Sequence, residues 1–200
     1  MKRMLPMLLV LLLTACREAP PAPTVTLPTA SGTSASTGQT GTTRTDSAAF
    51  LQTLWADFEE MVPFEVFGGT GYSPVWGGPG DLDLRRREEL KLWYLIPEPY
   101  LSELHSGASL VHLMNPSILT LTAVQLKQPE REKDFLRAWQ IHLQDYVWPC
   151  DSPQRMLIAT VDDQMVMAYG RSDVLEDLRR SLVKTFPQTK MQCYGSLILN

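Results

Sequence analysis

The stretch LHSGASLVHL-MNPS-ILTLTAVQL, residues 104–126, decides the fold class of this chain. It holds two apolar runs, residues 104–113 and 118–126, on either side of the segment Met114-Asn115-Pro116-Ser117. Apolar runs that are bounded by turn-forming residues are typical of β-strands, and Asn-Pro favours a turn. Because so short a connection forces neighbouring strands to lie antiparallel, the stretch predicts a β-hairpin.

A second unit of the same kind lies further along the chain. Pro129 is expected to open a helix that ends near Tyr146, since proline is tolerated in the first turn. Residues 156–161 and 165–169 predict a second hairpin, and residues 173–186 a final helix. The order strand–strand–helix–strand–strand–helix predicts an α+β fold, with one antiparallel sheet of two hairpins and the helices packed on one face.

The folded part is expected to begin with one more helix, near Asp46. Apolar residues recur there at helical spacing, and Pro63 ends the pattern. These residues are Phe50, Leu51, Leu54, Trp55, Phe58 and Met61. A single globular α+β domain over residues 46–200 is therefore predicted.

The first fifteen residues have the features of a secretory signal. Lys2 and Arg3 precede an apolar run, Leu8–Leu13, that is too short to span a bilayer. The run closes on Leu13-Thr14-Ala15-Cys16, which resembles the lipobox of bacterial lipoproteins. This resemblance implies cleavage before Cys16, lipidation of its sulfur, and a lipid anchor on the extracytoplasmic side of the membrane. An ordinary signal peptide, with Cys16 incidental, is the alternative.

Residues 16–45 differ sharply in composition from the rest of the chain. Three prolines are succeeded by a Ser/Thr/Gly tract from Thr29 to Thr43. Such a stretch buries too little apolar surface to offset its ordering entropy, so a disordered linker is expected behind the lipidated N-terminus.

The charge balance argues against nucleic-acid binding. The chain has 18 basic and 22 acidic residues, a net charge of −4. Removal of residues 1–15 leaves 16 basic against 22 acidic residues, a net charge of about −6. Phosphate binding requires a basic face, so no nucleic-acid partner is expected.

Two cysteines remain besides Cys16. Outside the cytoplasm Cys150 and Cys193 can form a disulfide, and two unpaired thiols are the alternative. Without histidines at matched spacing they make a poor zinc set, so no metal is expected.

The layout resembles that of a known family. It is carried by residues 123–127 (AVQLK), by a helix ending in Asp145-Tyr146, and by Ala168-Tyr169-Gly170 closing the second hairpin. Together with the lipobox and linker, the segment from about Leu101 to Gly170 is similar to a family of uncharacterised bacterial lipoproteins carrying a domain of unknown function. The resemblance implies the doubled strand–strand–helix unit and brings no catalytic residues.

The sequence offers no convergent catalytic set. Gly68-Gly69-Thr70-Gly71 lacks the phosphate-loop spacing and its lysine. Ser109 follows Gly107, but Val111 stands where a nucleophile elbow needs a second glycine. No catalytic residue and no cofactor are therefore predicted.

One segment, Phe64 to Gly80, combines six glycines with four aromatic residues. It is expected to be either a packed loop or a binding surface formed by Phe67, Tyr72 and Trp76, since aromatic side chains concentrate at interaction hot spots.

From the sequence features taken together, we expect a membrane-anchored extracytoplasmic lipoprotein that acts as a non-enzymatic binding or assembly module for an envelope protein or glycan. A hydrolase acting on cell-envelope material is the alternative.

Overall fold

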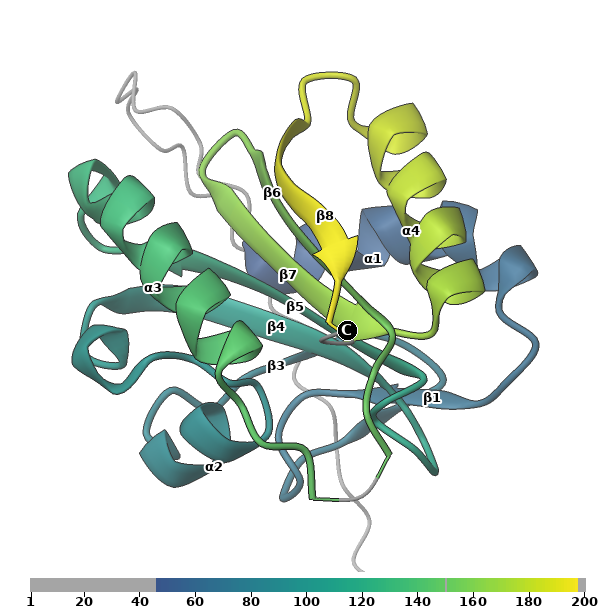
Figure 1. The fold of residues 1–200 in the computed structure, drawn as a ribbon, viewed down its shortest axis with the longest axis horizontal. Coiled ribbons are helices and arrows are strands. Elements are labelled where there is room, and N and C mark those ends of the chain that lie inside the picture. Colours follow the sequence, from purple (N-terminus) through teal and green to yellow (C-terminus); the bar gives the residue numbers. More distant parts are fainter. Residues whose placement is uncertain (1–45, 150, 198–200) are drawn as a thin grey trace, which may run out of the picture. The chain divides into compact units, whose positions relative to one another are not determined.

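In a computed structural model that describes residues 46–149 and 151–197, the chain forms an eight-stranded antiparallel sheet with four α-helices (Figure 1). The strands are β1 (Val66–Gly68), β2 (Val75–Trp76), β3 (Gly80–Asp81), β4 (Leu104–His112), β5 (Leu119–Leu126), β6 (Arg155–Val161), β7 (Gln164–Gly170) and β8 (Lys190–Ser196). The α-helices are α1 (Ser47–Phe58), α2 (Arg87–Leu92), α3 (Glu132–Gln144) and α4 (Ser172–Thr185), with short 3₁₀ turns at Glu59–Met61, Glu98–Tyr100 and Pro129–Arg131. The predicted α+β class and antiparallel sheet are confirmed.

The strand order is β2-β1-β4-β5-β7-β6-β8, and β3 pairs with β4 beside β1. Strands β4 and β5 pair across the turn at residues 114–117, with Ala108 opposite Ala123. Strand β5 also pairs with β7, where Leu121 lies opposite Ala168, so the two hairpins share one continuous sheet. The sheet is wider than two hairpins because β1, β2 and β3 extend one side and β8 extends the other.

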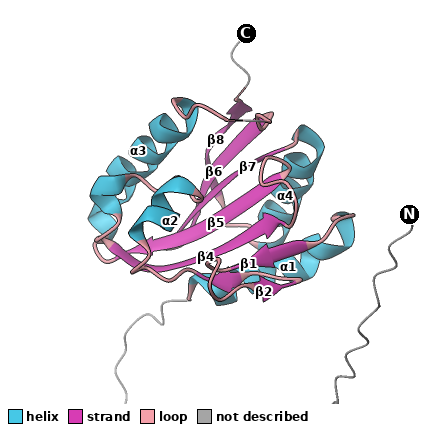
Figure 2. Cartoon of the chain, turned by 90° about the horizontal axis from the view of Figure 1, so that it is seen from below, coloured by secondary structure: helices cyan, strands magenta, loops and turns pink. Residues whose placement is uncertain are grey.

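The expectation that the helices cover one face is wrong. Helices α1 and α4 pack on one face of the sheet, and α2 and α3 pack on the other (Figure 2). The reason is visible in β5, whose eight residues are all buried. Leu119 and Leu121 join the core under α1 and α4, whereas Val124 and Leu126 join the core under α2 and α3. A strand that is buried on both faces requires a covering layer on each.

A close backbone crossing explains part of the glycine-rich segment. Strands β1 and β3 pair with successive parts of β4, which brings Gly68 against Gly80. A Cβ atom on Gly68 would lie 2.2 Å from the Gly80 nitrogen and 2.4 Å from the Ser109 carbonyl oxygen. Only glycine fits such an approach. The crossing fixes the position of Phe67, the neighbour of Gly68 in β1.

At the chain end, β8 forms an edge of the sheet and pairs with β6. The predicted signal peptide, Cys16, the linker and Cys150 lie outside the described residues. None of the helices in the described part is long and apolar enough to cross a membrane.

Candidate functional site

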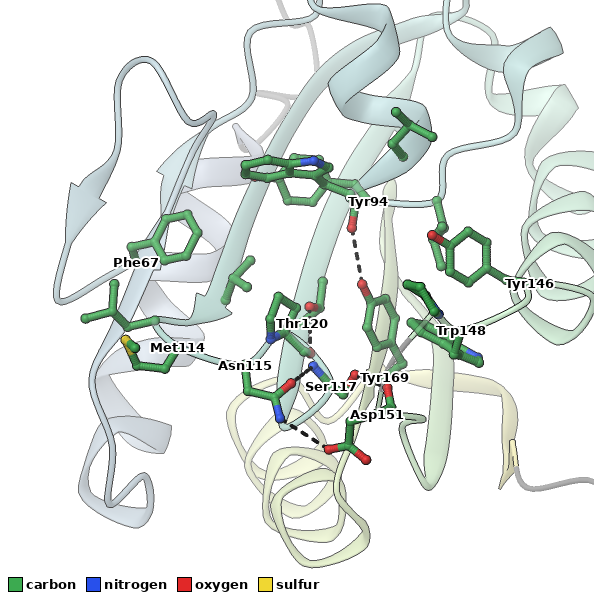
Figure 3. A pocket seen from close by; sticks show the side chains of 17 residues that line it. Phe67, Tyr94, Met114, Asn115, Ser117, Thr120, Tyr146, Trp148, Asp151 and Tyr169 are labelled. Carbon is green, nitrogen blue, oxygen red and sulfur yellow. Dashed lines mark hydrogen bonds between the residues drawn. The ribbon is translucent and has the colours of Figure 1, made fainter.

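A pocket of about 630 Å³ opens on the sheet face that α2 and α3 cover (Figure 3). It lies where the end of α2, the β4–β5 turn and the segment after α3 meet, with β7 behind them. Six aromatic side chains line it: Phe67, Trp93, Tyr94, Tyr146, Trp148 and Tyr169. Most of the remaining lining is aliphatic, so the pocket is apolar except at one end.

One wall is a cluster of three rings. Trp148 lies 4.8 Å from Tyr146 and 4.9 Å from Tyr169, measured between ring centroids. The Tyr169 hydroxyl donates a hydrogen bond of 3.2 Å to the Trp93 carbonyl, which links this wall to the end of α2. Burial raises the pKa of Tyr169 to about 12, so the phenol stays neutral and keeps donating at physiological pH.

The opposite wall depends on how α2 ends. After α2, Leu95 adopts a left-handed backbone with φ of 50°, a conformation that glycine usually supplies at a helix C-terminus. Leu95 is buried, and packing holds it there. This turn directs Tyr94 inward, where its hydroxyl donates to the Gly69 carbonyl at 2.5 Å. Burial raises the pKa of Tyr94 to about 12, so this hydroxyl is also neutral.

The polar end of the pocket joins the β4–β5 turn to the segment after α3. The Asn115 side-chain amide donates to the Asp151 carboxylate at 3.2 Å, and the Ser117 hydroxyl donates to the Asp151 carbonyl at 2.6 Å. Thr120, also in the lining, donates its hydroxyl hydrogen to the Pro116 carbonyl at 3.0 Å. Among the described residues that line the pocket, Asp151 is the only one with a charged side chain.

His112 holds the turn that carries Asn115. Its Nδ1 accepts hydrogen bonds from the backbone nitrogens of Met114 and Asn115, both at 3.0 Å. Its ring lies 4.5 Å from that of Phe64. Burial lowers the pKa of His112, and the nearby charge of Arg171 lowers it further. The imidazole is therefore the neutral acceptor that this turn requires.

The structure brings together two of the three residues of the predicted binding surface. Phe67 and Trp76 are register partners on β1 and β2 with their rings 6.1 Å apart, and Phe67 lines the pocket. Tyr72 lies outside the pocket lining, 79% exposed, with the Arg86 guanidinium 3.6 Å from its ring centroid. The loop that carries Tyr72 is fixed by a 2.6 Å hydrogen bond from the Gly71 nitrogen to Glu89.

The sequence analysis did not predict several of the residues that line the pocket. The helix expected to end near Tyr146 ends at Gln144 as α3, and Tyr146 and Trp148 extend from the segment beyond. Trp93 and Tyr169 lie 76 positions apart and meet only in the fold. The one local signal is the pair of aromatic residues two positions apart directly after a helix.

Ser109 and Cys193, which were also considered in the sequence analysis, lie outside the pocket lining. The Ser109 side chain is fully buried, and its oxygen accepts a hydrogen bond from the Gly69 nitrogen at 3.0 Å. Cys193 lies half-buried on β8, and burial raises the pKa of its thiol. Its pairing with Cys150 stays a prediction, because Cys150 lies outside the described residues. Residues 46–149 and 151–197 contain no group of three side chains placed to ligate a metal.

Comparison with protein-family models, with curated proteins and with solved structures found no match to this chain.

Proposed function

We propose that this chain is a membrane-anchored extracytoplasmic lipoprotein whose domain is a non-enzymatic binding module, and that it binds a small ring-bearing ligand in the pocket. The observation that carries the proposal is the density of aromatic side chains, six of them around one cavity of about 630 Å³. Sites for small molecules commonly have volumes of about 300–1,000 Å³, apolar walls and few polar groups. This pocket has that composition.

The pocket is also held in shape before any ligand arrives. Hydrogen bonds fix Tyr94 to Gly69 and Tyr169 to Trp93, so two walls are tied to the backbone. The contact between Asn115 and Asp151 ties the polar end. A preformed site loses little conformational entropy on binding, which favours affinity for a small rigid ligand.

The membrane anchor in this proposal is supported by the sequence Leu13-Thr14-Ala15-Cys16 after an apolar run. Two acyl chains at Cys16 would hold the domain stably at the membrane, whereas one chain holds only marginally. The resemblance to uncharacterised bacterial lipoproteins is part of the proposal, and the doubled strand–strand–helix order supports it. The ligand would come from the cell envelope, as a free molecule or as a glycan or protein group.

A neutral fluorescent probe, N-phenyl-1-naphthylamine, tests the pocket. Its emission should rise saturably with protein and shift to shorter wavelength, as in an apolar site. Trp93→Ala should weaken binding roughly tenfold, about 1.4 kcal/mol, because Trp93 lines the pocket and is 52% exposed.

The control is Ile141→Ala, which shortens an exposed apolar side chain of α3 outside this pocket. It should leave probe affinity unchanged. Absence of saturable binding, or loss of binding in Ile141→Ala with none in Trp93→Ala, would contradict the proposal. Thermal melting of each variant checks that the fold is retained.

A further inference from the structure

We infer that the ligand of this pocket is an organic cation: a quaternary or protonated amine attached to an apolar or aromatic body. This inference rests on the proposed binding function and adds the charge of the ligand to it. Two independent features of the lining carry it, the sign of its charge and the arrangement of its rings.

The first feature is electrostatic. Asp151 supplies the only charged side chain among the described lining residues, and no described lysine, arginine or histidine lines the pocket. The carboxylate receives a hydrogen bond from the neutral Asn115 amide, and none of the ion pairs in the described part of the chain involves it. A cation would gain a partner in Asp151, whereas an anion would meet a like charge with nothing to offset it.

The second feature is the ring cluster of Tyr146, Trp148 and Tyr169. The three rings lie together on one side of the pocket, and Asp151 lies at its polar end (Figure 3). The face of an aromatic ring carries a negative electrostatic potential, which attracts a cation within about 6 Å of the ring centroid. The attraction is strongest for the indole of tryptophan. Both phenols that are anchored in the pocket, Tyr94 and Tyr169, are neutral.

The two features act on the same part of the ligand, its charged head group. Apolar walls accept the body, while the rings and the carboxylate both favour a positive head group at the polar end. A neutral sugar would also stack on aromatic rings, but it needs hydrogen-bonding partners around its edge. The polar side chains at this end, Asn115, Ser117 and Thr120, are already engaged with protein atoms. The lining therefore suits a cation better than a polyol.

Three probes of one shape test the inference with the full chain. They are 4-(trimethylammonio)phenol, its neutral counterpart 4-tert-butylphenol and the anion 4-hydroxybenzenesulfonate, each titrated while tryptophan emission is followed and in competition with N-phenyl-1-naphthylamine. The cation should bind at least tenfold more tightly than the neutral phenol, and the anion more weakly than either. The preference for the cation should fall as salt is added, because Asp151 is exposed.

Two variants separate the contributions. Asp151→Asn should lower affinity for the cation severalfold and leave affinity for 4-tert-butylphenol unchanged. Trp148→Leu keeps an apolar side chain but removes the ring, so it should also lower affinity for the cation more than for the neutral phenol. Equal effects of either variant on both probes would overturn the inference.

The outcomes also separate this inference from the proposed function. Binding of 4-tert-butylphenol as tightly as the cation, or preference for the sulfonate, would overturn the cationic ligand and leave the binding pocket standing. If none of the three probes displaces the naphthylamine, the inference of a cationic ligand is overturned as well. Failure of the naphthylamine itself to bind would remove the proposed function and, with it, this inference.

Discussion

The hydroxyl of Tyr94, at the end of α2, donates a hydrogen bond of 2.5 Å to the carbonyl of Gly69, in the glycine-rich segment after β1. Both groups are buried, and Ser109 also approaches that carbonyl, with its hydroxyl 3.3 Å away. The bond joins one wall of the pocket to the edge of the sheet. It helps to hold a glycine-rich loop, which is costly to order, beside the pocket.

Tyr94→Phe should therefore lower the free energy of unfolding by about 1 kcal/mol, the net value of a buried hydrogen bond. The loss is no larger because the Ser109 hydroxyl remains as a donor to the Gly69 carbonyl. Urea denaturation followed by circular dichroism measures the change. Tyr72→Phe is the matched control, since Tyr72 is exposed, and it should leave the unfolding midpoint within error. Equal midpoints for wild type and Tyr94→Phe would show that the bond contributes nothing.

Gly68→Ala should lower the free energy of unfolding by about 3 kcal/mol or more. The added methyl group meets backbone atoms at 2.2 and 2.4 Å, and backbone cannot yield as a flexible side chain can. Gly195→Ala is the control, because a Cβ there would have nothing within 4 Å, and it should change stability by less than about 0.5 kcal/mol. Similar melting temperatures for the two variants would disprove the close crossing of β1 and β3.

The stability of the domain should fall as the pH is lowered below about 6.5, the ordinary pKa of histidine, because of His112. Its pKa is lowered in the folded state, so the unfolded chain takes up the proton first and its population grows with acidity. The stabilisation is complete above pH 6.5 and is lost as the pH falls through the lowered pKa of His112. Below that, Nδ1 carries a proton and cannot accept from Met114 and Asn115.

The comparison with His112→Asn isolates this contribution, since asparagine offers an acceptor that does not titrate in this range. The difference in unfolding free energy between the two proteins should narrow between pH 7 and pH 5. A difference that stays constant over this range would show that His112 does not titrate with unfolding.

Cys150 and Cys193 are predicted to be bridged in protein isolated without reductant. The closed loop would hold about 43 residues, and a bridge of that span stabilises by roughly 3–4 kcal/mol on the chain-entropy account. Peptide mapping of alkylated, unreduced protein decides the point. Two alkylated thiols in the native protein would end the prediction, and reduction would then leave the melting temperature unchanged.

Membrane association is predicted to require the Cys16 sulfur. Wild-type protein should partition with membranes, and Cys16→Ser should appear in the soluble fraction or keep its signal peptide, because serine cannot form the thioether to diacylglycerol. Mass spectrometry of the mature N-terminus gives the direct measurement. An unmodified N-terminus at any residue other than Cys16 would replace the lipid anchor with an ordinary signal peptide.

The sequence predicted those elements whose pattern is local. The apolar runs around Met114–Ser117 and the helix expected to open at Pro129 can be read from neighbouring residues, and the structure has a hairpin and a helix there. The covering of both sheet faces was missed because residues 119–122 of β5 alternate leucine and threonine, a pattern that indicates one apolar face. The structure buries Thr120 and Thr122 as well. The pocket was missed because its walls come from distant segments, as with Trp93 and Tyr169.

Because the pocket is assembled from distant segments, binding of a ligand in it is linked to the stability of the whole fold. Groups contributed by β1, α2, the β4–β5 turn, the segment after α3 and β7 meet only when the domain is intact, so a ligand would bind the native state and not the unfolded chain. Ligand at about 100 times its dissociation constant would raise the free energy of unfolding by about 2.7 kcal/mol. A melting curve alone can thus screen a chemical library against this protein, with no assay of its biological role.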